Sequence, residues 1–172
     1  MRHVLFWGGL ILFVVWAGVR IFSDIQFNRN CKGYLKRAAD ANNIELAREE
    51  LGKALQYMEY HQLTEGYASI LYTTPDEDLG FWYKNIKAAH NQLLKIDPEA
   101  ISDLEESNVL MKLRETLCDR SNGNTSVTVP SGISIYPFNL LWCIVCMLGA
   151  VACIFGGIRK VQKGDWPVLD YL

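Results

Sequence analysis

Two apolar runs flank a polar centre in this chain. Val4–Val19 and Leu140–Ile158 contain no charged residue, whereas the stretch between them is rich in Lys, Glu and Asp. A transmembrane helix needs about 20 mostly apolar residues, because it rises about 1.5 Å per residue across about 30 Å of hydrocarbon. We therefore predict transmembrane helices at residues 4–22 and 138–158, the first one completed by Arg20 reaching toward the membrane surface.

A cleaved signal peptide is the alternative for the first run. Arg2 would supply its basic start, and Val15-Trp16-Ala17 is a possible cleavage site. The run is rich in large aromatic residues and no clean pair of small residues follows it, so a span is the preferred interpretation.

The charges around the spans predict the orientation. Arg159, Lys160 and Lys163 follow the second span, and the positive-inside tendency places this tail, residues 159–172, in the cytoplasm. Two spans then place the N-terminus in the cytoplasm and the central domain on the exoplasmic side of a plasma or bacterial inner membrane. The basic residues that follow the first span favour the opposite orientation, but long loops contribute little to this rule.

Helical periodicity dominates the polar centre. Apolar positions recur at steps of three and four in four stretches, at about residues 21–41, 44–61, 74–96 and 97–118. Similar lengths and short connections favour an antiparallel four-helix bundle, so we predict an all-α protein with an extramembrane domain at 23–118.

Local signals place the predicted helix ends. Asn43 is a suitable N-cap for the second helix, Thr74-Pro75-Asp76-Glu77 reads as a capping box for the third, and Asp97-Pro98-Glu99 precedes the fourth. Residues 119–137 are predicted to form a linker that begins with the turn-forming sequence 121–124.

The polar centre contains two cysteines, Cys31 and Cys118. In an oxidising compartment they could form one disulfide, and the bundle places them at the same end. The alternative is that they are two separate buried thiols.

Small residues recur along one side of the second span, at Cys146, Gly149, Cys153 and Gly156. In lipid, small residues at steps of three and four let helices approach closely, so we predict a helix-packing face that contacts a partner. Cys143-x-x-Cys146 lacks a second pair of ligands and lies in an apolar run, so it does not indicate a metal or redox site.

The longest connection between the predicted helices has about thirteen residues and is rich in aromatic residues. Long loops are often functional, and aromatic rings suit a membrane surface or a partner. The alternative is that these rings close the end of the core. The candidate contact residues are Tyr67, Tyr72, Phe81, Trp82 and Tyr83.

The sequence contains no recognisable catalytic, cofactor or metal motif. The three histidines have no partner ligand at helical spacing, and a net charge of −2 argues against nucleic acid as a partner. We therefore expect a non-enzymatic accessory or scaffold subunit of a membrane protein complex, in contact with lipid and with another integral membrane protein or a second copy of itself.

The alternative is an exoplasmic ligand-sensing helical module that acts through a partner. It requires a pocket inside the bundle, for which Asn28, His90 and Asn108 are the polar candidates. The layout of span, helical bundle and span resembles the sensor region of bacterial two-span receptors. That resemblance stops at the second span, because residues 159–172 are too few for a signalling output domain.

Overall fold

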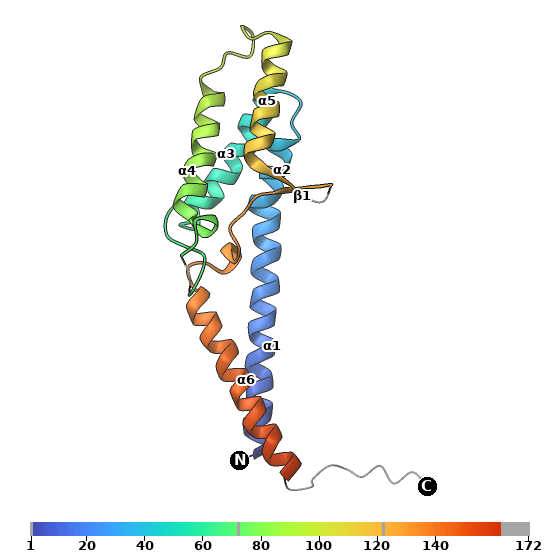
Figure 1. Cartoon of the computed structure of the whole chain (residues 1–172), viewed down its shortest axis with the longest axis vertical. Coiled ribbons are helices and arrows are strands. Elements are labelled where there is room, and N and C mark those ends of the chain that lie inside the picture. The colour runs from blue at the N-terminus through green and yellow to red at the C-terminus, as the bar shows by residue number, and fades with distance from the viewer. Residues whose placement is uncertain (1, 72, 122, 163–172) are drawn as a thin grey trace, which may run out of the picture. The chain divides into compact units, whose positions relative to one another are not determined.

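The computed structural model describes residues 2–71, 73–121 and 123–162, and 72% of it is helix, which confirms the mostly helical class. The α-helices, in chain order, are α1 (Arg2–Phe27), α2 (Gly33–Ala39), α3 (Ile44–Tyr60), α4 (Leu79–Leu94), α5 (Asp103–Leu117) and α6 (Asn139–Gln162) (Figure 1). The π-helical segment Asn28–Lys32 joins α1 to α2, and short 3₁₀ turns occupy Pro75–Glu77 and Ile133–Ile135. The strands β1 (Cys118–Ser121) and β2 (Asn124–Val127) form an antiparallel hairpin.

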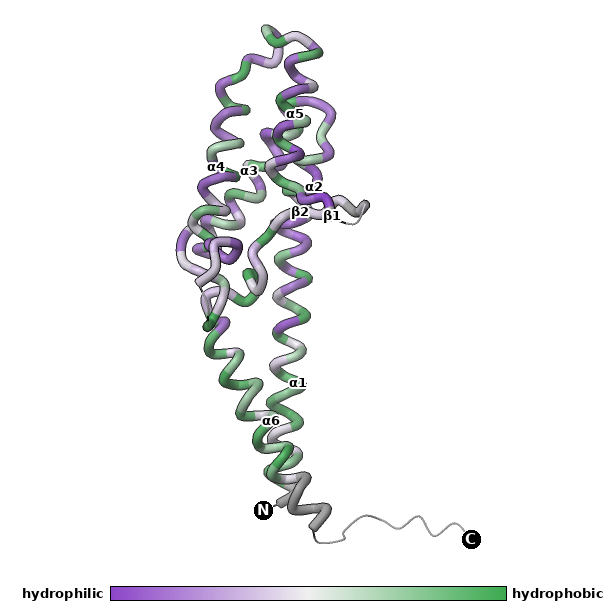
Figure 2. Tube along the Cα trace, in the orientation of Figure 1, coloured by the Kyte–Doolittle hydropathy of each residue, from purple (hydrophilic) through white to green (hydrophobic). Residues whose placement is uncertain are grey.

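The chain forms two units, which are described separately. The span unit contains the chain up to Phe22 and from Phe138 onward, and the helical unit is Ser23–Pro137. Two helices, Val4–Ala39 and Asn139–Gly156, are long and apolar enough to cross a membrane, and Figure 2 shows the apolar positions of α1 and α6 in green. Few residues of these apolar segments are buried inside the protein, 6% in the first and 17% in the second.

The core of the helical unit lies around α3. This helix packs against α2 and α4, and α5 packs mainly against α2 (Figure 1). The periodic apolar positions of α3 and most of those of α4 become buried, whereas Leu104 and Met111 of the fourth predicted stripe stay exposed. Each large apolar side chain removed from water contributes about 1.5–3 kcal/mol. The largest fully buried apolar side chains are Leu35, Ile44, Leu51, Met58, Leu79 and Leu93.

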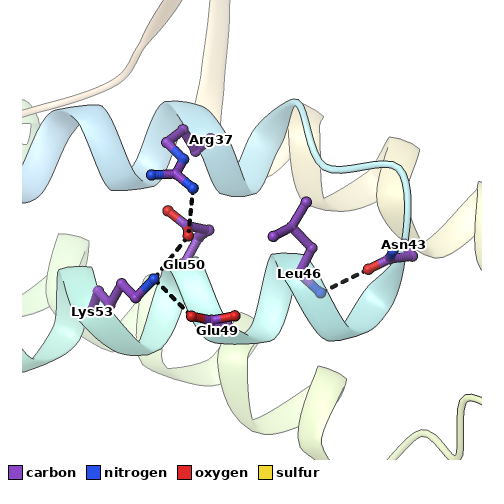
Figure 3. A network of polar contacts seen from close by, with 6 residues as sticks. All are labelled: Arg37, Asn43, Leu46, Glu49, Glu50 and Lys53. Atoms are coloured by element: carbon purple, nitrogen blue, oxygen red, sulfur yellow. Dashed lines mark hydrogen bonds and ion pairs between the residues drawn. The ribbon is translucent and has the colours of Figure 1, made fainter.

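Polar contacts fix the start of α3 and the end of α4. α3 begins where the sequence predicted, because the Asn43 side chain accepts a hydrogen bond from the Leu46 N–H at 2.8 Å (Figure 3). At the end of α4, Nη2 of Arg48 donates to the carbonyls of Leu93 and Ile96 at 2.7 and 3.0 Å. One arginine on α3 therefore binds two carbonyls at the end of α4.

The predicted start of the third helix at Thr74 is wrong. The Thr74 hydroxyl donates to the Glu77 carboxylate at 2.8 Å and does not cap the backbone, so Pro75–Glu77 forms only a 3₁₀ turn. α4 begins behind Asp78, whose carboxylate accepts a hydrogen bond from the Phe81 N–H at 3.0 Å. The sequence Thr74–Glu77, which resembles a capping box, forms a turn, and Asp78 caps α4.

The predicted start of the fourth helix at Asp97 is also wrong. The Asp97 carboxylate accepts from the Glu99 N–H at 3.1 Å, which stabilises a local turn. α5 begins at Asp103, where Ser102 and Glu105 form a capping box.

The predicted disulfide between Cys31 and Cys118 is absent. All five cysteines lie among the described residues and all are free, with no two at bonding distance. Cys31 is fully buried on the side of the first helix that faces the core, whereas Cys118 lines a cavity beside Lys36 and Asp40. The two thiols therefore lie in different surroundings, Cys31 in the core and Cys118 at the start of β1.

Candidate functional site

A cleft in the helical unit has a volume of about 630 Å³. Its walls are the turn 74–78, the first two turns of α4, the end of α5 with Asp119, and the segment 128–131. We call it the acidic–aromatic cleft, because Asp76, Glu77, Asp78 and Asp119 line it together with Phe81 and Trp82. Its size lies in the range of about 300–1,000 Å³ that is usual for ligand sites.

Two of the candidate contact residues, Phe81 and Trp82, line this cleft. Phe81 is 63% exposed, although water solvates a phenyl ring poorly. Trp82 is half-buried, and its indole N–H donates to the Thr128 carbonyl at 2.9 Å. That hydrogen bond joins the two walls of the cleft, so the Trp82 ring is fixed and the Phe81 ring is available.

The long connection before α4 is folded back onto that helix. The Leu79 N–H donates to the Gly66 carbonyl at 2.9 Å, and the Ala68 N–H donates to the Glu77 carbonyl at 3.0 Å. Gly66 has a φ of +92°, a conformation that L side chains rarely adopt, so glycine is favoured there, and its missing side chain leaves room for the Tyr136 hydroxyl. The connection is thus an ordered support of the cleft wall.

The other candidate contact residues lie elsewhere. Tyr67 is 43% exposed in the connection but does not line the cleft, and Tyr72 lies outside the described residues. Tyr83 is 8% exposed and packs in the core, where its hydroxyl donates to Glu59 on α3. That bond, followed by the Lys87 ammonium, lowers the pKa of the Glu59 carboxyl. Tyr83 therefore joins α4 to α3 inside the core. Of the candidate contact residues, it fits the alternative interpretation that the aromatic rings pack against the core.

The small residues of α6 contact α1 of the same chain. A Cβ added to Gly9 would lie 2.8 Å from the Gly149 carbonyl oxygen and 2.9 Å from both the backbone nitrogen and the sulfur of Cys153. A Cβ added to Gly156 would lie 3.0–3.1 Å from Phe6. The predicted packing face at Gly149, Cys153 and Gly156 thus faces the first helix, whereas Cys146 is half-exposed.

Sequence reasoning missed one wall of the cleft. Asp119 and the segment 128–131 belong to what the sequence showed only as a linker, and no local pattern indicated that β1 pairs with β2 from Cys118↔Val127 to Ser121↔Asn124. The alternating residues near Val127 were the available signal, and they were too few to define a partner.

The polar residues proposed for an internal pocket do not meet. Asn28 is exposed and donates to Asp24 at 3.3 Å, Asn108 is exposed on α5, and His90 is half-buried beside Gly52. Among the described residues, no group of three or more His, Cys, Asp or Glu side chains is arranged to hold a metal ion.

Comparison with known protein families, with curated proteins and with solved structures finds no match to this chain.

Proposed function

We propose that the chain is a two-span integral membrane protein of the plasma or bacterial inner membrane. Its large exposed apolar side chains support this proposal, because a contiguous apolar surface on a long helix is costly in water and favourable in lipid. In α1, Leu5, Trp7 and Ile11 are 52–61% exposed, and in α6, Met147 and Ile154 are 63% and 56% exposed.

In this proposal both ends of the chain lie in the cytoplasm and the helical unit lies on the exoplasmic side. Helices α2 to α5 act there as a small antiparallel bundle that supports the acidic–aromatic cleft. The close approach of Gly9 to Gly149 lets the two spans pair within one chain, so their small residues are already occupied. Contact with a partner then falls to the outer faces of the spans and to the cleft.

The function that this arrangement supports best is that of a non-enzymatic accessory or scaffold subunit of a membrane protein complex. The exposed Phe81 ring at the mouth of the cleft is the observation that carries the proposal. Aromatic residues, Phe included, are enriched in protein interfaces relative to the rest of the surface.

The test is purification of the tagged full-length protein from its native membrane in mild detergent, followed by quantitative mass spectrometry. We expect a stoichiometric integral membrane partner. Phe81→Ala should reduce its recovery severalfold, because truncating a central aromatic costs about 2 kcal/mol or more. Tyr60→Ala is the matched control, because Tyr60 is 82% exposed and does not line the cleft. A clean monomer, or equal recovery with all three proteins, would contradict the proposal.

A second candidate function is ligand sensing through a partner. The volume of the cleft favours it, because the cleft could hold a small molecule even though Asn28, His90 and Asn108 do not form a pocket. A thermal-shift screen of small cations and amines against the full-length protein tests it, and a screen without any stabilising compound would exclude this candidate for the compounds tested.

A further inference from the structure

The charges of the helical unit are sorted between two cavities. The acidic–aromatic cleft is lined by four carboxylates, and no Lys, Arg or His is among the described residues that line it. A second cavity, of about 570 Å³, is lined by Lys32, Lys36 and Arg114, with Asp40 as its only acidic residue among those described. The local potential in the first cleft is therefore negative, and its walls concentrate cations from solution.

Two of the four carboxylates are available to a ligand. Asp78 accepts the hydrogen bond that starts α4, and Glu77 is bonded to Thr74, so both already have a structural role. Asp76 and Asp119 are exposed and form no ion pair with any residue that the structure describes. They belong to different walls of the cleft, and a cation between those walls would have a carboxylate on either side.

Aromatic rings complete the recognition chemistry. The Phe81 ring is 63% exposed, and the neighbouring Trp82 ring is held by its bond to Thr128. Arg and Lys side chains suit such walls, because their apolar stems pack on rings while their heads reach carboxylates, and a cation over an aromatic face is itself attracted to it. The volume of about 630 Å³ exceeds what one side chain needs, so a short segment fits better than a single residue.

We infer that the acidic–aromatic cleft binds a short segment rich in Arg or Lys on the protein partner. This inference rests on the proposed accessory function and specifies the chemistry of its partner. Asp76 and Asp119 hold the cationic heads, and Phe81 and Trp82 pack on the stems.

The direct test uses the full-length protein in a nonionic detergent and a fluorescent Gly-Arg-Gly-Arg-Gly peptide as the probe, followed by fluorescence anisotropy. The double variant Asp76→Asn/Asp119→Asn removes two charges from the cleft without removing a helix cap. Glu45→Gln/Glu99→Gln is the matched control, because it removes the same charge from exposed residues that do not line the cleft. Circular dichroism of each variant verifies that the helices are retained.

We expect the cleft variant to bind the peptide about fivefold to thirtyfold more weakly. This is the fold-change that corresponds to the loss of two solvent-screened charge contacts. The matched control should change the affinity less than twofold, about the effect of bulk charge alone. Phe81→Ala should also weaken binding, and a Gly-Glu-Gly-Glu-Gly peptide should not bind. Equal affinity of the cleft variant and the control, or no binding of the arginine peptide to the unaltered protein, would overturn the inference.

A cross-linking experiment separates this inference from the proposed function. A benzophenone amino acid in place of Phe81 is photoactivated in native membranes, and the cross-linked peptide is sequenced. A peptide rich in Arg or Lys supports both proposals. A partner cross-linked through a segment without basic residues overturns the inference and leaves the accessory function standing. If no partner is cross-linked and none co-purifies, the accessory function fails, and the anisotropy experiment still decides the chemistry of the cleft.

Discussion

A buried glutamate gives the sharpest test of the packing between α2 and α3. Glu50 is 1% exposed. Its Oε1 forms an ion pair with Arg37 at 3.0 Å and accepts a hydrogen bond from Lys53 at 3.1 Å (Figure 3). Its other oxygen, Oε2, is buried and has no hydrogen-bond partner among the described residues. Arg37→Met should therefore destabilise the helical unit, whereas Glu50→Met should not.

The magnitude follows from the geometry. Two unit charges 3.0 Å apart attract by about 1.4 kcal/mol in water and about 5.5 kcal/mol at an effective dielectric constant of about 20. The Arg37 side chain is 62% exposed, so the value lies toward the lower limit. We expect Arg37→Met to cost about 1–3 kcal/mol, because it leaves a buried carboxylate with Lys53 alone. Glu50→Met also removes the unpartnered oxygen and should stay within about 1 kcal/mol of the unaltered protein.

The assay is urea unfolding of the full-length protein in nonionic micelles, followed by far-ultraviolet circular dichroism. Helices within the micelle keep their backbone bonds, so the urea-dependent signal reports on the helical unit. Glu49→Gln is the matched control, because Glu49 is the neighbouring residue, is 64% exposed and forms an exposed ion pair with Lys53. No measurable change is expected. An unchanged Arg37→Met variant, or a Glu50→Met variant less stable than Arg37→Met, would refute the reasoning.

Three further predictions concern the spans, the thiols and the response to pH. Gly9→Ala should separate α1 from α6 at a cost of about 1–3 kcal/mol, measured as a lower temperature of aggregation in detergent. Gly8→Ala is the control and should be neutral or slightly stabilising, because a Cβ at Gly8 would meet no atom within 4 Å. A maleimide should label Cys118 and spare the fully buried Cys31 unless urea is present, and non-reducing electrophoresis should show no disulfide-dependent shift; equal labelling of both thiols would be the contrary result. Burial lowers the pKa of His90 below its usual 6.5. The free energy of unfolding should therefore be unaffected by His90 above pH 6.5 and should decrease as the pH falls below that value. In urea titrations, His90→Gln should show a smaller decrease.

The helices were predictable where burial and capping agree. The apolar stripe of α3 and its Asn43 cap lie where the sequence placed them, because one face of that helix is enclosed by α2 and α4. The starts of α4 and α5 were not predictable from local signals alone. Thr74 and Asp97 have the chemistry of helix caps, and each stabilises a turn of its own.

The sequence indicated only one wall of the candidate site. Phe81 and Trp82 stand out as aromatic residues beside a long connection, but the opposite wall comes from residues 128–131, which are brought there by a short hairpin. Short strands carry little pattern, and their partner depends on tertiary packing. The cysteine pairing failed for a related reason: Cys31 points into the core, whereas Cys118 begins a short strand that the sequence did not reveal.

We propose that the chain crosses a membrane twice, with the helical unit on the exoplasmic side. The most direct measurement is thiol labelling with a membrane-impermeant maleimide in intact cells, with the parent chain as the baseline for its native cysteines. We expect that Ser131→Cys is labelled in intact cells and that a cysteine added after Leu172 is labelled only after permeabilisation. Alkaline carbonate should not extract the protein. Extraction by carbonate, or labelling of the added C-terminal cysteine in intact cells, would contradict it.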